Sequence, residues 1–506
     1  MLKSDRYQLF ILSVLSLYME MVLIRYLGTE VLIFAFFKNL ALMAAFLGLG
    51  LGFLCTKDKR DYFTYSGLAF LFLNGIIILA LPLGIVFFRF TNPYDLLLAL
   101  PKFDQHTFTL IVENGRTLLI MLGLFVLSTF CFVGVGQRIG QFFEKLRPIE
   151  AYSINVFGSL LGGLLFTLLC QLETSPGIWL IVTGILLCLV QFRASHVALS
   201  ALGLAYCVWL GPEIARRNYG PDFVQTYWSP YYRIDLVEST VGLKKPAHWG
   251  WDLMVGYGSF QVMLDASPEN MARFSPKVQD GMRDVFERPY RMLGKVPKKV
   301  LILASGSGSD VAGALRAGVE SIDAVDIDPV ITKIGKTIHP EKPYLDPRVH
   351  LHVMDARTYL RNCKEKYDLI VFAYLDSHTA FSCLSSMRTD NYVFTKEAFE
   401  EANKLLKPDG TLYVTFLCFK DWLWDRHGKA MTVATGMTPL SYCMNNGHVD
   451  VGTMVSGPGV KGLKATDLKI PVPQRPILPD SPVNMSEDDW PYDALPRREL
   501  SASYLI

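Results

Sequence analysis

Long apolar stretches fill the first part of the 506-residue chain, and charged residues become common only after about residue 212. Most of these stretches reach the ~20 apolar residues that a helix needs to cross a lipid bilayer. The pattern therefore predicts a transmembrane helical domain over residues 1–212, with six or seven spans. The candidate spans are residues 7–27, 30–55, 62–90, 115–137, 150–170, 176–192 and 195–210.

Positive charge predicts how these helices are oriented. Lysines and arginines follow the second and fourth spans, whereas the loop at 91–114 is nearly free of them. Basic loops stay in the cytoplasm, so we expect the N-terminus there. Seven spans would carry the rest of the chain outside, away from cytosolic nucleotide cofactors. We therefore expect that the short stretch 195–210 does not cross, in a multi-pass protein of a bacterial inner membrane with a cytoplasmic soluble part.

The polar half of the chain has a different pattern of hydrophobic and polar residues. Strand-like runs at 231–237, 251–255 and 259–265 predict a small β-rich subdomain over residues 213–298. Strand and helix patterns then alternate, which predicts an α/β fold with a doubly wound, parallel, Rossmann-like sheet over residues 299–455. A Pro/Gly-rich C-terminal tail, residues 456–506, completes the expected organisation.

Two kinds of residue gather at the predicted strand ends. Gly306 and Gly308 follow the first strand and open a helix, where backbone can approach a ligand closely. Asp326 ends the second strand and Asp355 the third, where their carboxylates can accept hydrogen bonds from ribose and adenine. The alternative is that these acids cap helices or form turns. A dinucleotide site is not expected, because Val311 occupies the third glycine position of G-x-G-x-x-G.

The amino-acid composition indicates which kinds of binding partner the protein has. The formal net charge of +2 gives no case for nucleic-acid binding, whereas the 51% hydrophobic content fits a protein in contact with a lipid bilayer. The nine cysteines form no C-x-x-C pair, and no two metal-ligating residues show a metal-site spacing. We therefore predict neither a metal site nor a disulfide framework.

Polar and small residues inside the predicted spans have two interpretations. Glu20 and Arg25 form either a polar site within the helix bundle or a structural pair at the headgroup level. Recurrent glycines let helices pack closely, and we expect that role for them rather than transport. These glycines are Gly48, Gly50 and Gly52 in the second span and Gly158, Gly162 and Gly163 in the fifth.

EMVLIR and the glycine-rich second span resemble the start of membrane-fused members of the spermidine synthase family, and three stretches of the polar half resemble the family itself. They are VLILASGSGSDVAGALRAGVESIDAVDIDPVI, HPEKPYLDPRVHLHVMDARTYL, and YDLIVF followed by LDS. The resemblance implies a Rossmann-like fold that binds S-adenosylmethionine or decarboxylated S-adenosylmethionine. By this resemblance Asp326 binds the ribose, Asp355 with Ala356 binds the adenine, and Gly306 and Gly308 line the loop under the aminopropyl or amino-acid tail.

On the acceptor side the sequence departs from the family pattern. Ser307 and Ala373 stand where the family places acidic residues, and Pro289-Tyr290 replaces a Tyr-His pair. Lost charge-assisted hydrogen bonds weaken a bound diamine by ~1.5–3 kcal/mol each, so we expect standard aminopropyl transfer to be impaired. Asp310 either substitutes for a lost acid or caps the following helix.

Candidate acceptor residues remain around this edge. Asp376 or His378 is the predicted base, and Arg388 is predicted to bind an anionic group. The alternative is a hydrogen-bonded loop without chemistry. The further predicted substrate-binding residues are Gln261, Tyr290, Asp390 and Tyr392.

The leading hypothesis is therefore a membrane-anchored transferase that uses an S-adenosyl cofactor on a small-molecule or membrane-associated acceptor. The alternatives are a methyltransferase and a non-enzymatic sensor or transporter with a cofactor-binding regulatory domain. The sequence leaves open whether the protein is a homo-oligomer. It also leaves open whether Asp488, Asp489 and Trp490 of the tail pack against the active-site edge or are solvated.

Overall fold

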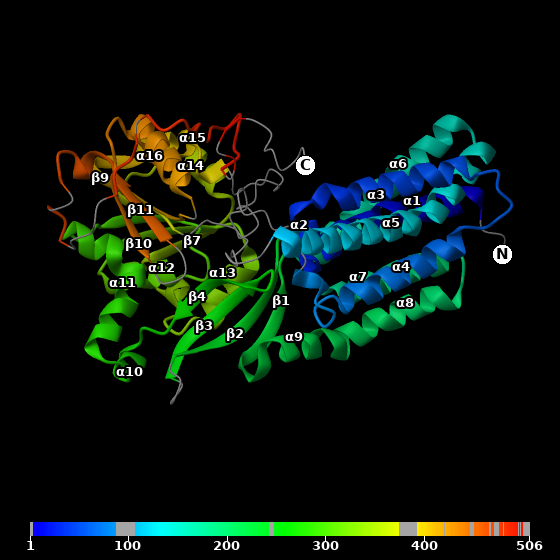
Figure 1. Ribbon diagram of the computed structural model, residues 1–506, viewed down its shortest axis with the longest axis horizontal. Coiled ribbons are helices and arrows are strands. Elements are labelled where there is room, and N and C mark those ends of the chain that lie inside the picture. Colours follow the sequence, from blue (N-terminus) through cyan, green and yellow to red (C-terminus); the bar gives the residue numbers. More distant parts are fainter. Residues whose placement is uncertain are drawn as a thin grey trace. The chain divides into compact units, whose positions relative to one another are not determined.

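The computed structural model describes residues 4–87, 107–241, 247–373, 392–418, 420–445 and 450–464, and shorter pieces of the tail up to residue 498. The chain divides into two compact units, which we describe separately (Figure 1). The helical unit comprises Met1–Pro93, Pro101–Asp235 and Val255–Tyr257, and the α/β unit comprises the remaining residues. The domain boundaries expected from the sequence stay a prediction.

The helical unit has a helix at each of the seven apolar stretches, which confirms those predicted elements. The stretch 30–55 is interrupted after residue 36, so it contributes two helices. The helices are α1 (Asp5–Glu30), α2 (Leu32–Phe36), α3 (Lys38–Leu54), α4 (Phe63–Ile78), α5 (Thr107–Lys145), α6 (Pro148–Gln171), α7 (Pro176–Val190), α8 (Ala194–Ala205) and α9 (Gly211–Tyr219), with a π-helical turn at Tyr206–Leu210 and a 3-10 turn at Ile85–Phe87.

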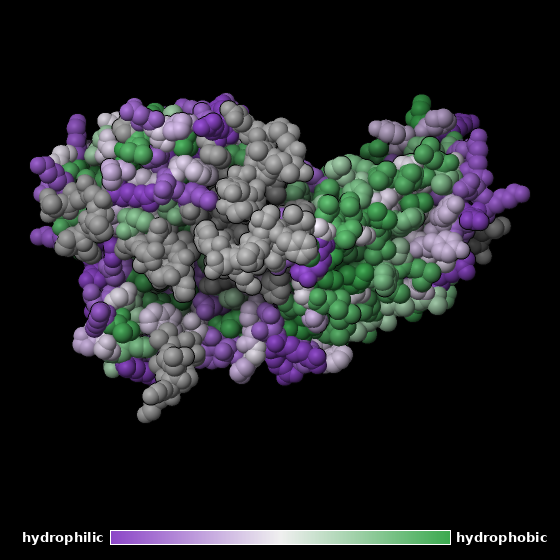
Figure 2. All heavy atoms as spheres, viewed as in Figure 1, coloured by the Kyte–Doolittle hydropathy of each residue, from purple (hydrophilic) through white to green (hydrophobic). Residues whose placement is uncertain are grey.

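Four of these segments are long and apolar enough to cross a membrane, and three shorter apolar helices accompany them. The expectation that the stretch 195–210 does not cross stays a prediction, and the last long segment runs from Ala194 to Asp222. It is extended by the π-helical turn and α9. Hydrophobic side chains cover much of the visible face of this unit in Figure 2, and Leu160, Leu164 and Leu168 are each 55% exposed. These features are compatible with membrane insertion.

Glycines bring several of these helices together. A Cβ atom at Gly162 of α6 would lie 2.2 Å from the carbonyl oxygen of Val14 in α1. A Cβ at Gly52 of α3 would lie 2.1 Å from the carbonyl oxygen of Val133 in α5. Gly48 and Gly158 pack similarly, which confirms the predicted role. Gly50 faces open space within 4 Å, so the prediction is wrong there.

Arg25 is held by protein carbonyls rather than extended toward headgroups. Its guanidinium donates to the main-chain oxygens of Ser229 and Pro230 and lies 5.5 Å from the ring centre of Trp179. Glu20 is buried, with 4% of its surface exposed. Within this helix Glu20 is therefore buried, and Arg25 is half-buried against protein groups.

A four-stranded sheet follows, in the order β1-β2-β3-β4. The three strands predicted from the sequence are confirmed, whereas β1 and two helices after β4 were not predicted. The second helix repeats apolar residues at helical spacing but contains Pro289. The elements are β1 (Phe223–Trp228), β2 (Arg233–Val241), β3 (Ala247–Val255), β4 (Gly258–Leu264), α10 (Pro268–Met271) and α11 (Pro276–Leu293).

A buried ionic cluster lies within the helical unit where β2 begins. Arg233 Nη1 is 3.0 Å from both carboxylate oxygens of Glu30, the last residue of α1. The Tyr257 hydroxyl donates to Glu30 and accepts from Arg233 at 2.6 Å. Arg233 Nε lies 3.3 Å from Asp235. The side chains of Glu30 and Arg233 are each only 6% exposed, so this ion pair is shielded from water.

The α/β unit is built on a seven-stranded sheet in the order β10-β11-β9-β8-β5-β6-β7. The five strands from β5 to β9 are parallel, as predicted, whereas β11 runs antiparallel to both β9 and β10. The strands are β5 (Lys299–Leu303), β6 (Ser321–Asp326), β7 (Val349–Val353), β8 (Tyr367–Phe372), β9 (Leu406–Leu417), β10 (Leu440–Asn445) and β11 (Asp450–Ser456).

Helices cover both faces of this sheet, which confirms the doubly wound, Rossmann-like architecture. Val300 and Ile302 of β5 pack in one core with α11 and α12, whereas Leu301 and Leu303 pack in another with α14, α15 and α16. Successive side chains of a strand point to opposite faces, so one strand serves both cores. The helices are α12 (Ser309–Arg316), α13 (Pro329–Thr337), α14 (Ala356–Asn362), α15 (Lys396–Lys404) and α16 (Asp421–Thr435), and 3-10 turns lie at Pro343–Leu345 and Pro458–Val460.

Candidate cofactor site and its acceptor edge

The site lies where the strand order reverses. Strand β5 pairs with β6 on one side and with β8 on the other, so the chain crosses in opposite directions from β5. Ligands of open α/β sheets bind at such a switch point, beyond the carboxyl ends of the strands. The segment that leaves β5 here, residues 304–308, is called the glycine loop below. Ala304, Gly306 and Gly308 have φ values of +55°, +55° and +97°.

Both glycines of this loop are required by the chain itself. A Cβ atom at Gly306 would lie 2.1 Å from the Gln261 side-chain amide, and one at Gly308 would lie 2.6 Å from Pro343. Their positive φ values are also costly for other residues. These glycines therefore have a structural role in the protein itself, in addition to the predicted close approach to a ligand.

Strand β4 supports the glycine loop from the side. The main-chain amide of Ser307 donates to Gln261 Oε1 at 3.0 Å, and Ser309 Oγ donates to the carbonyl of Val262 at 2.8 Å. Gln261, which was predicted to bind substrate, therefore lies directly against the loop. The small sheet and the Rossmann-like sheet build this edge together.

Asp326 closes the loop from the end of β6. Its Oδ2 accepts from the Gly306 amide at 2.8 Å, and its Oδ1 accepts from the Asp328 amide at 2.9 Å. Burial raises the pKa of Asp326 to about 6, although these amides oppose the shift. The helix cap of α13 is Asp328, whose side chain accepts from Val330 and Ile331. Asp326 therefore does not cap this helix, but its bond to the Asp328 amide, two residues on, forms a turn as the structural alternative expected.

Asp355 stands at the end of the neighbouring strand β7. Its carboxylate caps α14 by accepting from the amide and the hydroxyl of Thr358, at 2.8 and 3.0 Å. The capping alternative is thus realised at this position. The Met354 amide donates to the Asp326 carbonyl at 2.9 Å, so the two acidic strand ends lie side by side. Ala356, the first residue of α14, is buried next to them.

Sequence reasoning missed Tyr344 as a residue of this site. Its hydroxyl lies 2.9 Å from Ser305 Oγ and 2.7 Å from the Gly306 carbonyl oxygen. It is carried by the 3-10 turn Pro343–Leu345, between α13 and β7. Tyr344 thereby holds the glycine loop at Ser305 and at the carbonyl of Gly306, whose amide is bound by Asp326.

Asp310 and Tyr290 border the other side of the loop. Asp310 is in the first turn of α12, but the N-cap residue is Gly308 and no side chain caps this helix. Burial raises the pKa of Asp310 to about 7, and it raises the pKa of the Tyr290 hydroxyl, with Asp310 contributing. Asp310 therefore does not cap α12, and its carboxyl group has a pKa near 7.

Comparison with known proteins decides the family of this region. A family model described as "Spermine/spermidine synthase domain" matches residues 290–419. Residues 290–419 are a spermine/spermidine synthase domain.

Individual relatives agree with the match. The chain is 32% identical over 122 residues to a polyamine aminopropyltransferase of Korarchaeum cryptofilum, covering 24% of this chain and 35% of that protein. It is 22% identical over 306 residues to polyamine aminopropyltransferase 1 of Streptomyces coelicolor, covering 55% of this chain and 53% of that protein. The chain thus spans about a third to a half of these relatives. A spermidine synthase structure from Thermotoga maritima aligns at 16% identity and a TM-score of 0.35, covering 48% of this chain and 75% of that one.

The acceptor edge of the synthase domain is only partly described. Ala373 follows β8 and is buried, and Ser307 is 1% exposed, so the two neutral residues are part of the domain interior. Asp376, His378, Arg388 and Asp390 lie outside the described residues. Tyr392 is described, and its carbonyl oxygen is 3.1 Å from Thr395 Oγ1. Among the described residues, no group of three or more metal-ligating side chains occurs.

Proposed function

We propose that this protein is a membrane-anchored transferase that binds S-adenosylmethionine or decarboxylated S-adenosylmethionine, with aminopropyl transfer as its leading reaction. The observation that carries the proposal is Asp326. This carboxylate ends β6 at the switch point, holds the amide of Gly306, and stands beside the end of β7. It is the position from which an acid binds the ribose of a nucleoside in this fold.

The rest of the nucleoside site follows from its neighbours. Asp355 and Ala356 are proposed to bind the adenine, because they lie at the end of β7 next to Asp326. Gly306 and Gly308 are proposed to run under the tail that carries the sulfonium. Membrane anchoring is supported by the long apolar helices and their exposed leucines.

The proposed transfer makes one demand on the acceptor edge. An amine attacks the carbon next to the sulfonium, a C–N bond forms, the C–S bond breaks, and methylthioadenosine leaves. The amine must lose a proton, and a carboxylate with a pKa near the working pH suits this task. Asp310, whose pKa is raised to about 7 by burial, is a proposed base, and Asp376 and His378 are the alternative candidates. Arg388, Asp390, Tyr392 and Tyr290 are proposed acceptor contacts.

Methyl transfer is the second candidate, favoured by the neutral residues Ser307 and Ala373. Both reactions displace a sulfonium, but methyl transfer from S-adenosylmethionine leaves S-adenosylhomocysteine instead of methylthioadenosine. Mass spectrometry of the nucleoside product therefore distinguishes them.

Replacing Asp326 by asparagine is expected to weaken binding of decarboxylated S-adenosylmethionine by about 10- to 100-fold, because charge-assisted hydrogen bonds to the ribose are worth about 1.5–3 kcal/mol each. Isothermal titration calorimetry of the full chain in detergent measures this loss. The matched control is Asp346→Asn, since Asp346 pairs at the surface with Arg348. Equal affinities in the wild type and Asp326→Asn would remove the observation on which the proposal rests.

The same affinity is expected to depend on pH. The folded-state pKa of Asp326 is raised to about 6, so the carboxylate that binds the ribose is lost as the pH falls below 6. Affinity should then decrease by at most about tenfold per pH unit. The sign for stability is opposite: a raised carboxyl pKa contributes stability at low pH that is lost as the pH rises through 6. Calorimetry from pH 5 to 8 checks the binding, and Asp326→Asn should remove the dependence below pH 6.

A further inference from the structure

The C-terminal segment, residues 484–493 with Leu495, is docked on three helices of the α/β unit. The Lys396 amide at the start of α15 donates to the Ser486 carbonyl at 2.9 Å. The Asp488 amide donates to Glu397 Oε2 at 3.0 Å. Buried Arg426 of α16 donates to main-chain oxygens of the segment, namely those of Asn484, Tyr492, Asp493 and Leu495.

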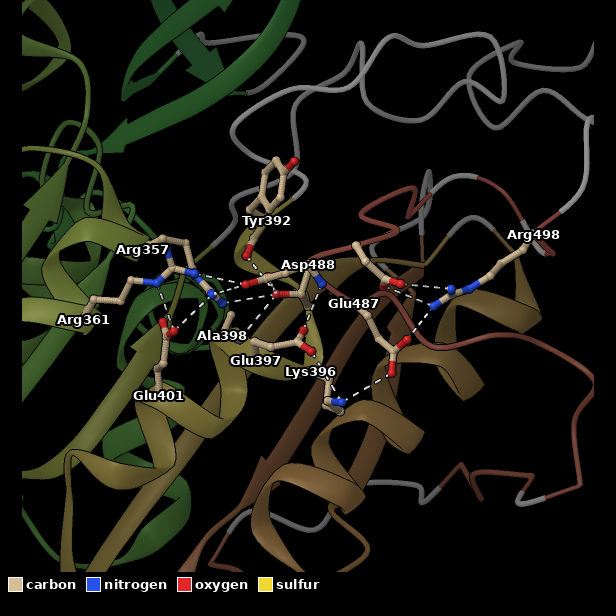
Figure 3. Close-up of polar contacts among 12 residues, drawn as sticks. Arg357, Arg361, Tyr392, Lys396, Glu397, Ala398, Glu401, Glu487, Asp488 and Arg498 are labelled. Carbon is tan, nitrogen blue, oxygen red and sulfur yellow. Dashed lines mark hydrogen bonds and ion pairs between the residues drawn. The ribbon is translucent and has the colours of Figure 1, made fainter.

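Asp488 connects this segment to α14, the helix that begins directly after Asp355. Its Oδ2 accepts from Arg357 at 2.8 Å and from Arg361 at 3.0 Å, and its Oδ1 accepts from Thr395 Oγ1 at 2.8 Å (Figure 3). One carboxylate thus joins the tail to α14 and to the N-cap of α15. Of the two alternatives left open for the tail, Asp488 packs on the domain, whereas the Asp489 side chain is 72% exposed.

The partners of Asp488 are close to the proposed adenine site. Arg357 directly follows Ala356 in the first turn of α14, two residues after Asp355, and its side chain is 6% exposed. Its guanidinium also binds Glu401 at 3.1 Å and Thr395 Oγ1 at 3.2 Å. Arg357 shares both carboxylates, Glu401 and Asp488, with the more exposed Arg361. Without Asp488, Glu401 alone would compensate the charge, and the first turn of α14 would lose its tie to the tail.

We propose that the C-terminal segment, through Asp488, positions the adenine edge of the nucleoside site. Asp488 is a positioning residue: it holds Arg357, which fixes the first turn of α14 and with it Asp355 and Ala356. Through Thr395 it also fixes the main chain at Tyr392, a proposed acceptor contact. This inference rests on the proposed function and names how the same site is held in shape.

The test compares Asp488→Asn with Asp489→Asn in the full chain in detergent. Asparagine keeps the shape but removes the charge, and Asp489 offers a matched control because it is the next residue and pairs only weakly with exposed Arg498, at 3.3 Å. Calorimetry measures the affinity for methylthioadenosine, and hydrogen exchange measures the protection of residues 355–360 and 392–396. We expect Asp488→Asn to weaken nucleoside binding about tenfold and to lower protection in both stretches, with Asp489→Asn unchanged.

The outcomes separate the two hypotheses. If Asp488→Asn unfolds at a lower temperature but binds methylthioadenosine as the wild type does, the segment is a structural staple and the inference is overturned. If the wild type itself binds no nucleoside, the proposed function fails, and with it the role assigned to Asp488, whatever the exchange data show. Should Asp488→Asn fold poorly, Arg361→Gln removes a bond to the same carboxylate from a side chain that is 57% exposed. That variant should weaken binding in the same direction, and unchanged affinity would count against the inference.

Discussion

Replacing Glu30 by alanine is expected to destabilise the helical unit by about 3 kcal/mol, because buried Arg233 loses one of its two carboxylate partners and keeps only Asp235. Arg233 binds both oxygens of Glu30, and neither side chain is more than 6% exposed. Asp235 and Tyr257 would remain as its neighbours, but the Tyr257 hydroxyl would also lose the carboxylate to which it donates.

The prediction is checked by thermal or denaturant unfolding in detergent, followed by tryptophan fluorescence. Glu30→Gln is the matched control, because it keeps the side-chain volume and an oxygen that can accept from Tyr257 and Arg233. It is expected to be much closer to the wild type than Glu30→Ala. If Glu30→Ala is as stable as the wild type, the pair is not buried in solution as described.

Replacing Arg426 by methionine is expected to release the C-terminal segment from α16. The guanidinium is fully buried and donates to four main-chain carbonyls, and an unsatisfied buried polar group costs about 1–3 kcal/mol. The rings of Trp422 and Trp490 lie within 5.2 Å of its carbon Cζ and would lose their cation. The expected total loss is about 3 kcal/mol or more, concentrated in the segment.

Limited proteolysis with mass spectrometry of the fragments measures this release, since docked backbone resists cleavage. Arg498→Met is the control: Arg498 also lies over Trp490, at 5.5 Å, but its side chain is 40% exposed. Its ion pairs at the surface are worth little. Equal cleavage of residues 484–495 in both variants would show that Arg426 does not anchor the segment.

Much of the fold could be predicted because the periodicity of apolar residues is local. The seven apolar stretches and the five parallel strands from β5 to β9 all appear in the structure. The helix α11 could not be predicted as readily, since Pro289 within it is a strong helix breaker in sequence terms. The strands β10 and β11 lie in a segment rich in glycine and polar residues, where a pairing partner decides the conformation.

The site residues at the strand ends could be predicted from the sequence, whereas their contacts with distant residues could not. Asp326 and Asp355 are found at one sheet edge because alternating strands and helices impose that geometry. Tyr344 and Gln261 reach the glycine loop from 38 and 46 residues away along the chain. Arg233 finds Glu30 across 203 residues. Such partners cannot be predicted from a local sequence pattern, because only the packed tertiary structure brings them together.

The place where the two units divide has a consequence for how such a protein is dissected and how it arose. Asp235 and the turn Val255–Tyr257 belong to the helical unit, whereas the following parts of β2 and β4 belong to the α/β unit. A fragment begun at residue 213 would keep Arg233 and discard Glu30, its counterion. A simple genetic fusion of a membrane bundle to a soluble enzyme would join two self-sufficient pieces at a linker. Here the division falls within strands of the chain rather than at a linker, so we expect neither part to fold when it is expressed alone.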